Sequence, residues 1–368
     1  MTMQPRDKLS KARLRHATHY LEVIRRCDDL YLQGGENLTR ALAMFELEMS
    51  NIEKGQRWAV SRLQDDAAAR RLVSDYPVAG AYLLDLRQHP HERIASLEAA
   101  LEAARRLKDR GREAVHLGNL GLAYAAFGEM RRAVESHEQA LTITREIGDR
   151  RGEGRALGNL GFAYYDTGET RRAIDFYEQH LAIARETGDQ HSEGVALGNL
   201  GAAYFDLGEP RRAIDFHEQA LVIDRETGDQ RNEGIDLSNL GIAYKTLGEM
   251  RRAIDCYEQA LVIARRIDDR RGESIVLGKL GAVYYGHGEP RRAVESHERA
   301  LAIAREIGDR LCEAIALFNM SNALYQIRQR EQAMGLMEAA VPIFEQIESP
   351  YAARARETLT KWRNFASE

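Results

Sequence analysis

The sequence predicts an all-α solenoid, a stack of antiparallel helix hairpins that follows a separate helical domain at the N-terminus. The 368 residues repeat with a period of 40 and without an insertion. Blocks begin at Gly111, Arg151, His191, Arg231 and Arg271, and a weaker sixth block begins at Leu311. Such a period is typical of stacked repeats, in which each unit buries its apolar face only against its neighbours. Apolar residues within a block recur at helical rather than alternating spacing, so we expect no strands.

Two recurring marks divide each block into two helices. A Gly-Glu pair lies in the middle of each block, at Gly128, Gly168, Gly208, Gly248 and Gly288. A second mark, Gly-Asp or Asp-Asp, closes each block, at Gly148, Gly188, Gly228, Asp268 and Gly308. Glycine after a helix suits the left-handed conformation in which helices often end. In the block that begins at Arg151, we therefore expect helices over roughly 153–167 and 169–187.

The two ends of the chain depart from the repeat. Residues 1–70 carry no copy of it and predict a helical domain of two or three helices, separated at Gly34 and Gly35. The stretch 90–101 matches the second helix of a block, so residues 71–110 are expected to form a divergent first hairpin. Five full units then occupy 111–310, a degenerate sixth occupies 311–349, and a capping helix that starts at Pro350 occupies 350–368.

The letters of the repeat resemble the tetratricopeptide repeat. In the second block the matching residues are Leu157, Leu160, Gly161, Tyr164, Ala173, Tyr177 and His180. The usual unit of that family has about 34 residues. Units of 40 residues are similar to those of kinesin light chains and of the LGN/Pins cell-polarity adaptors. The resemblance implies a right-handed superhelix that binds a protein or an extended peptide in its concave groove.

The N-terminal segment resembles a different group of proteins. A His-x-x-x-Tyr-Leu helix is followed by an acidic helix that ends in Glu-x-x-Asn-Ile, and the matching residues are His16, Tyr20, Leu21, Glu48, Asn51 and Ile52. This layout is similar to the helical segment between the nucleotide-binding core and the repeats of bacterial STAND signalling ATPases. The resemblance implies a sensor arm that works with a nucleotide-binding signalling domain.

Composition argues against several classes of partner. The formal charge of -5 is small for the length, so we expect no binding to nucleic acid. No stretch approaches the roughly 18 apolar residues that a membrane span needs, so we expect no membrane partner. The basic N-terminus lacks the apolar core of a secretory signal. Three widely spaced cysteines, Cys27, Cys256 and Cys312, indicate a reducing compartment, and we expect a cytoplasmic protein.

No catalytic, metal-binding or cofactor motif is evident, and we expect a protein that is not an enzyme. Gly278-Lys279 is the only Gly-Lys pair, and it lacks both the spacing and the hydroxyl residue of a phosphate-binding loop. Three histidines share a slot with tyrosines, which predicts packing roles for His137, His217 and His297. Five arginine pairs lie beside acidic residues within one or two helical turns, which predicts ion pairing rather than a phosphate site.

One stripe of the first helix is the candidate ligand surface. In the second block its members lie at offsets 0, 3, 4, 7, 10 and 11, and they are Arg155, Gly158, Asn159, Phe162, Tyr165 and Asp166. Residues at these offsets share one helix face. Across the blocks the offset-4 position, here called the asparagine slot, holds Asn119, Asn159, Asn199, Asn239, Lys279 and Asn319. The family resemblance implies that this slot contacts the backbone of a ligand.

A side-chain amide both donates and accepts hydrogen bonds, so a column of asparagines suits an extended peptide of any sequence. Selectivity is expected from the variable neighbours Phe162, Tyr165, Asp166, Phe205, Asp206, Lys245, Tyr285 and Tyr325, and from Lys279, which replaces asparagine in the fifth copy. Their aromatic and acidic groups favour a ligand with apolar anchors and a basic residue. The alternative is structural, with each asparagine bonded to a neighbouring helix. At the second glycine slot, Gly121, Gly161, Gly201 and Gly241 are predicted to permit tight packing.

Three roles remain open at this point. The favoured role is ligand recognition as the sensor arm of a STAND-type signalling or defence assembly. The second is a free-standing adaptor of the kinesin-light-chain or LGN kind. The third is a structural array that assembles with itself and holds no ligand. All three agree with a repeat scaffold that lacks a cofactor, and the sequence leaves the oligomeric state open.

Overall fold

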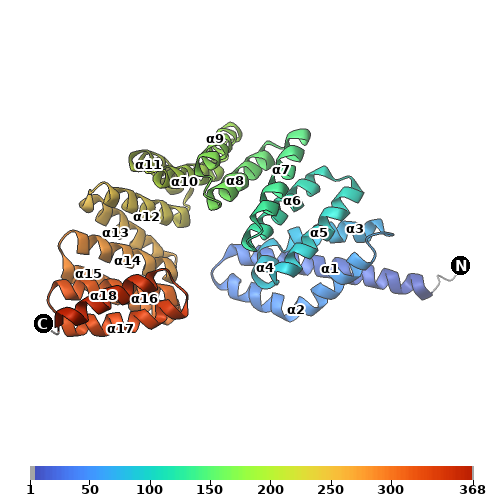
Figure 1. Cartoon of the computed structure of the whole chain (residues 1–368). Helices are drawn as coiled ribbons and strands as arrows, with labels where there is room; N and C mark the ends of the chain where they lie inside the picture. The colour runs from blue at the N-terminus through green and yellow to red at the C-terminus, as the bar shows by residue number, and fades with distance from the viewer. Residues whose placement is uncertain (1–4, 367–368) are drawn as a thin grey trace. The chain divides into compact units, whose positions relative to one another are not determined.

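The computed structural model describes residues 5–366, and within this range the chain forms 18 helices and no strand (Figure 1). The predicted all-α fold of antiparallel helix hairpins is confirmed. The helices group into two compact units, one that ends at Gly188 and one that begins at Asp189. Each unit is described by itself below.

The first unit contains the non-repeating helices and two full hairpins. Its helices are α1 (Pro5–Gln33), α2 (Glu36–Ser61), α3 (Ala67–Ala79), α4 (Ala81–Arg87), α5 (Pro90–Leu107), α6 (Arg110–Ala126), α7 (Met130–Ile147), α8 (Arg150–Asp166) and α9 (Thr170–Thr187). The second unit continues the same alternation of first and second helices. Its helices are α10 (Gln190–Asp206), α11 (Pro210–Thr227), α12 (Gln230–Thr246), α13 (Met250–Arg266), α14 (Arg270–Gly286), α15 (Pro290–Ile307), α16 (Arg310–Gln326), α17 (Arg330–Gln346) and α18 (Tyr351–Ala366).

The N-terminal helices α1 and α2 form an antiparallel hairpin that turns at Gly34 and Gly35. Both glycines have positive φ, at 67° and 57°, a conformation that glycine adopts without steric cost. The stretch expected to open the divergent hairpin is not one helix, since it breaks between α3 and α4 at Gly80. A side chain at Gly80 would lie 2.3 Å from the Cδ1 atom of Ile24 in α1. The break therefore comes from close packing against a helix far away in the sequence.

The predicted glycine turns are confirmed in every full block. The mid-block glycines Gly128, Gly168, Gly208, Gly248 and Gly288 have φ between 79° and 82°. The glycines that close the blocks, Gly148, Gly188, Gly228 and Gly308, have φ between 65° and 74°. Asp268 occupies the same turn in the fourth full block with a φ of 56°. Asp268 therefore adopts a left-handed conformation that is sterically unfavourable for an L-residue but not for glycine.

Replacing Asp268 with glycine is expected to raise the free energy of unfolding by about 0.5–1 kcal/mol, because the left-handed backbone is relieved of its steric cost. Urea denaturation followed by circular dichroism measures the change. The reciprocal variant Gly228→Asp should lower the stability by a similar amount. A drop in stability for Asp268→Gly would mean that the aspartate side chain contributes more than the backbone conformation costs.

Inside each hairpin, one flat ring of the second helix packs directly on a glycine of the first helix. The pairs are His137 on Gly121, Tyr177 on Gly161, His217 on Gly201, Tyr257 on Gly241 and His297 on Gly281. All five rings are 1% exposed. A methyl group at any of the five glycines would lie 2.3–2.6 Å from a ring atom. The predictions that these histidines pack and that these glycines permit close approach are confirmed.

The second arginine of each Arg-Arg pair contacts other side chains of the repeat. Its guanidinium lies 3.7–4.9 Å from the centre of a tyrosine ring, in the pairs Arg132–Tyr124, Arg172–Tyr164, Arg212–Tyr204, Arg252–Tyr244 and Arg292–Tyr284. The same arginines pair at 2.7–3.5 Å with the glutamate three residues before them. The predicted ion pairing is therefore confirmed for the second arginine of each pair, and cation–π contact with the tyrosine accompanies it.

Candidate ligand-binding stripe

The asparagine slot lies on the first helix of each hairpin, two copies in the first unit and four in the second. Asn119 and Asn159 belong to α6 and α8. The remaining members, on α10, α12, α14 and α16, are Asn199, Asn239, Lys279 and Asn319. All six side chains are half-buried. A slot that is half-buried in every copy keeps its polar groups partly accessible while its surroundings hold them in place.

None of the five asparagine side chains forms a hydrogen bond to any other residue within 5–366. By contrast, Asn322, one turn further along α16, donates its Nδ2 hydrogen to the backbone oxygen of Phe318 at 2.8 Å. The structural alternative, in which each asparagine bonds a neighbouring helix, therefore has no support in these contacts. A half-buried amide without a protein partner is free to donate to and accept from a ligand backbone.

The glycine slot next to each asparagine serves packing in several copies. A side chain at Gly158 would lie 2.9 Å from Nδ1 of His180, and one at Gly198 would lie 3.1 Å from Oδ1 of Asp236. Gly118 and Gly278 face open space instead. In the sixth copy the same slot holds Phe318, which is buried. This glycine slot therefore does not form one continuous surface beside the asparagines, because its surroundings change from one repeat to the next.

The variable neighbours predicted to select the ligand divide into exposed and partly packed residues. The exposed ones are Phe162, Asp166, Asp206, Lys245 and Tyr285. Tyr165, Phe205 and Tyr325 are half-buried. Phe205 packs against the core of the second unit. Tyr325 stacks on Trp362 of α18, with ring centres 4.2 Å apart, so the C-terminal helix covers one face of that ring.

A cavity of about 340 Å³ brings two members of the asparagine slot together, Asn239 and Lys279. It lies among α12, α13 and α14, and its lining includes the side chains of Ile235 and Ile275. Sequence reasoning missed these two isoleucines as candidate site residues. The available signal was their position, because both occupy the offset-0 slot that holds Arg155 in the second block.

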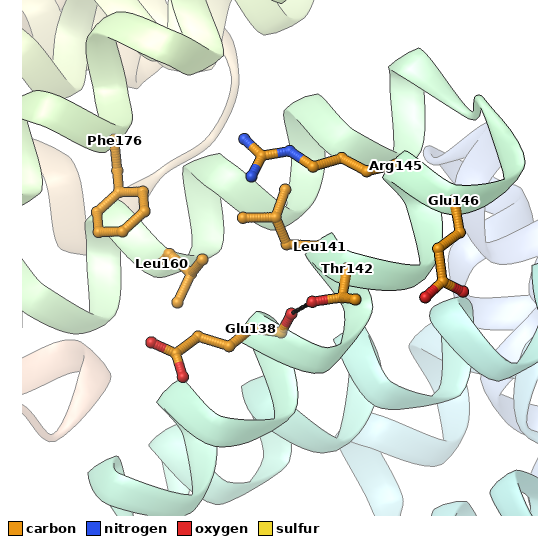
Figure 2. A pocket seen from close by; sticks show the side chains of 7 residues that line it. All are labelled: Glu138, Leu141, Thr142, Arg145, Glu146, Leu160 and Phe176. Atoms are coloured by element: carbon orange, nitrogen blue, oxygen red, sulfur yellow. Dashed lines mark hydrogen bonds between the residues drawn. The ribbon is translucent and has the colours of Figure 1, made fainter.

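A second concavity, of about 620 Å³, lies between the second helices α7 and α9, with Leu160 of α8 also in its lining. Figure 2 shows Phe176 on one side of it and the α7 residues Glu138 and Thr142 on the other. Its polar groups are used within the fold. Thr142 Oγ1 donates to the backbone oxygen of Glu138 at 2.9 Å, and Arg145 Nε pairs with Glu153 at 2.8 Å. We therefore place the candidate site on the first helices.

Sequence reasoning also missed a buried acidic pair in the second unit. Asp224 of α11 and Asp236 of α12 are 2% and 3% exposed. Nδ1 of His217 lies 2.6 Å from Oδ1 of Asp236. Burial and the neighbouring Asp236 raise the pKa of Asp224 to about 8. The signal in the sequence was a break in the repeat, since the same positions hold Ala184 and Ala196 one block earlier.

The part of the chain from residue 5 to residue 366 contains no grouping of His, Cys, Asp and Glu side chains that could hold a metal ion. Within the same range, no helix combines the length and the apolar character needed to cross a membrane. Cys27 and Cys256 are buried, and burial raises the pKa of each thiol to about 11. Thiols with such pKa values stay protonated at neutral pH and react poorly.

Stacked hairpins with a polar stripe on their first helices define a helical repeat scaffold. Family models described as tetratricopeptide repeat match residues 117–151, 152–226 and 233–306. The chain belongs to the tetratricopeptide repeat family. A search of curated proteins finds no match by sequence.

Several solved structures share the fold. BtubC (BKLC) from P. vanneervenii is 24% identical with a TM-score of 0.55, over 60% of this chain and 93% of that one. A STAND protein with a tetratricopeptide repeat sensor from Pyrococcus horikoshii is 16% identical with a TM-score of 0.65, over 95% of this chain and 55% of that one. Aspartyl phosphate phosphatase F from Bacillus subtilis is 13% identical with a TM-score of 0.54, over 99% of this chain and 95% of that one. Identities this low establish a shared fold and no more.

Proposed function

We propose that the chain is a non-catalytic scaffold that binds an extended protein segment along the first helices of its hairpins. One observation carries the proposal: five asparagines at the same slot present half-buried amides that no other residue within 5–366 satisfies. Each amide can accept from a backbone N–H and donate to a backbone C=O. Asn199, Asn239 and Asn319 provide three such groups within the second unit, and Asn119 and Asn159 provide two within the first.

The favoured role of this scaffold is to sense a ligand for a STAND-type signalling or defence assembly. The likeness to the Pyrococcus horikoshii STAND protein supports this role, because its TM-score of 0.65 exceeds the 0.54 of aspartyl phosphate phosphatase F, which covers 99% of this chain. The likeness to BtubC covers 60% of the chain. The helical domain before the repeats favours this role over a free-standing adaptor of the kinesin-light-chain kind, because its His16 and Asn51 match the STAND pattern. In this role the chain works with a nucleotide-binding signalling domain.

Replacing Asn199, Asn239 and Asn319 with alanine is expected to weaken ligand binding at least tenfold. Three net hydrogen bonds of about 0.5–1.5 kcal/mol each are lost, and about 1.4 kcal/mol is a factor of ten in affinity. The ligand is first recovered by affinity capture from a native lysate with the wild-type chain. Its affinity for the purified variant is then measured by isothermal titration calorimetry.

The matched control replaces three side-chain amides on the second helices of the same unit, Gln219, Gln259 and Gln332, with alanine. This control should bind the captured ligand as the wild type does. Helicity and melting temperature of the asparagine variant should stay near those of the wild type, since alanine is the better helix former. Unchanged affinity in the asparagine variant would disprove the proposed role of the slot. That result would place the contact with the ligand on another surface of the chain.

A further inference from the structure

A basic cavity lies between α1 and α2, outside the repeats, and has a volume of about 610 Å³. Its lining consists of Ala12, Arg13 and His16 of α1 and Lys54, Arg57, Trp58 and Ser61 of α2. The three α1 residues fall within one helical turn, and the four α2 residues follow the spacing 0, 3, 4 and 7. Residues at such spacings share one helix face. Two facing stripes of neighbouring helices therefore form this cavity.

Positive charge exceeds negative charge around this cavity. The stretches 9–16 and 54–63 contain six lysine and arginine residues and no aspartate or glutamate, in a chain whose formal charge is -5. Arg13 and Lys54 are exposed, and neither forms an ion pair with a side chain of residues 9–364. Arg57 pairs with Glu53 at 3.6 Å, but these side chains are 72% and 44% exposed, so the pair contributes little. An anion in the cavity would therefore lie near three cations and one carboxylate.

Packing beside the cavity holds the two helices at a fixed separation. α1 and α2 run side by side as an antiparallel pair (Figure 1). A side chain at Gly55, next to Lys54, would lie 3.2 Å from Cα of Ala17 in α1. Tyr76 of α3 donates its hydroxyl hydrogen to the backbone oxygen of Ala17 at 2.6 Å. Since the helices already hold this spacing, a ligand would not have to pay for their ordering.

Trp58 supplies a planar surface next to the three cations. Its half-buried side chain packs against the core of the N-terminal helices and also lines the cavity. An aromatic ring anchored in this way loses little freedom when a second ring stacks on it, and stacking accepts any nucleobase. His16 adds an imidazole that can donate a hydrogen bond even when it is neutral. The combination favours a ligand that joins a multiply charged anion to a planar ring.

We propose that this cavity binds a nucleoside triphosphate, with the phosphate groups at Arg13, Lys54 and Arg57 and the base on Trp58. A carboxylate carries a single charge, whereas a chain of phosphates carries several and so matches a set of cations. Arginine also forms paired hydrogen bonds to phosphate oxygens, and lysine attracts them as a point charge. The site is separate from the asparagine slot, because it lies on α1 and α2 and does not involve the repeats.

Isothermal titration calorimetry of the full chain with ATP, GTP, CTP and UTP, in a buffer without divalent cations, tests the site. Inorganic triphosphate, the four nucleosides and hexaglutamate are the comparison ligands. Wild-type protein is expected to bind at least one nucleotide about tenfold more tightly than triphosphate, its nucleoside or hexaglutamate. Triphosphate or hexaglutamate that binds as tightly as the best nucleotide overturns the proposal, because the cations would then act without the ring or without a preference for phosphate. Binding of no nucleotide overturns it as well.

Two variants assign the binding to the cavity. Arg13→Gln/Lys54→Gln changes two exposed side chains, so it should fold as the wild type does, and it should weaken nucleotide binding at least tenfold. Trp58→Leu should reduce the affinity for the nucleotide to within twofold of that for triphosphate, and it should leave the triphosphate affinity unchanged.

The matched control Arg26→Gln/Arg40→Gln removes two exposed charges from the same two helices, about 20 Å away along each helix axis. This control should bind the nucleotide within twofold of wild type. Nucleotide binding that survives in Arg13→Gln/Lys54→Gln, or that falls equally in the control, overturns the proposal.

Discussion

Replacing Gly161 with alanine is expected to lower the free energy of unfolding by about 2 kcal/mol, although alanine is the better helix former. The new methyl group would lie 2.5 Å from Cε1 of Tyr177 and 2.6 Å from its Cδ1. The ring cannot yield easily, because Tyr177 is 1% exposed and packed between helices. Overpacking of this kind costs about 1–3 kcal/mol, more than the up to 1 kcal/mol that helix propensity returns.

Gly118 offers a matched control, because it lies in the same kind of helix with nothing within 4 Å of an added side chain. Gly118→Ala should leave stability unchanged or raise it by up to about 1 kcal/mol. Urea titration gives the overall change, and amide hydrogen exchange in α8 and α9 localises it, since stability in a repeat array is close to a sum of local contributions. A Gly161→Ala variant as stable as wild type would show that α8 and α9 can move apart without a loss of stability.

A double-mutant cycle with Tyr177→Ala separates the steric effect from the backbone effect. Tyr177→Ala alone should destabilise the hairpin by about 3–5 kcal/mol, as truncation of a buried aromatic ring does. In that background, Gly161→Ala no longer meets a ring and should be neutral or stabilising. A cost of Gly161→Ala that persists without the ring would place the cause in the backbone of α8 instead.

The features that could be predicted from the sequence are those that depend on the spacing of residues close together in the chain. Helix boundaries, the turns at Gly128 and Gly168, and the packing of Tyr177 on Gly161 all follow from one 40-residue repeat, so five copies support each inference. The break at Gly80 was not predictable in this way. It depends on Ile24 of α1, 56 residues earlier in the chain, and no second copy of that contact exists in the sequence.

The candidate site also combines features that the repeat predicts with features that depend on tertiary contacts. The asparagine slot was predictable because its helical offset recurs, whereas its lack of hydrogen-bond partners depends on what the neighbouring helices present. Lys279 was visible as an exception to the pattern, but its bond to Ser238 spans 41 residues and needs the stacked arrangement of α12 and α14. At positions that depart from the repeat, the role of a residue depends on its tertiary contacts. The acidic pair in α11 and α12 is the strongest such departure.

Asp224 and Asp236 stand where most other blocks have alanine, and they should make the second unit less stable as the pH rises. Burial and the hydrogen bond and charge of Asp236 raise the pKa of Asp224 to about 8, whereas an unfolded aspartate titrates near about 3.9. The folded chain therefore holds a proton that the unfolded chain has lost. Stability from this group is complete below about pH 4 and is lost progressively as the pH rises through about 8.

Asp224→Ala is accordingly expected to stabilise the protein by about 1–3 kcal/mol at pH 8 and much less at pH 5. Alanine fits the site, because Ala184, Ala264 and Ala304 occupy the same position in other blocks. The variant should also flatten the dependence of stability on pH between about 4 and 8. Urea denaturation at half-unit pH steps, compared with wild type, measures both effects.

Asp236→Ala separates the acidic pair from the histidine contact. It removes the partner of Nδ1 of His217, which lies 2.6 Å away, but it also removes the charge that opposes ionisation of Asp224. The equivalent Nδ1 atoms of His137 and His297 are buried without a hydrogen-bond partner, so the fold accommodates this loss. Asp224→Ala/Asp236→Ala should therefore be at least as stable as wild type at pH 8. A double variant that is less stable there, with an unchanged pH profile, would show that the two carboxyl groups share their proton without strain and act as a structural bond between α11 and α12.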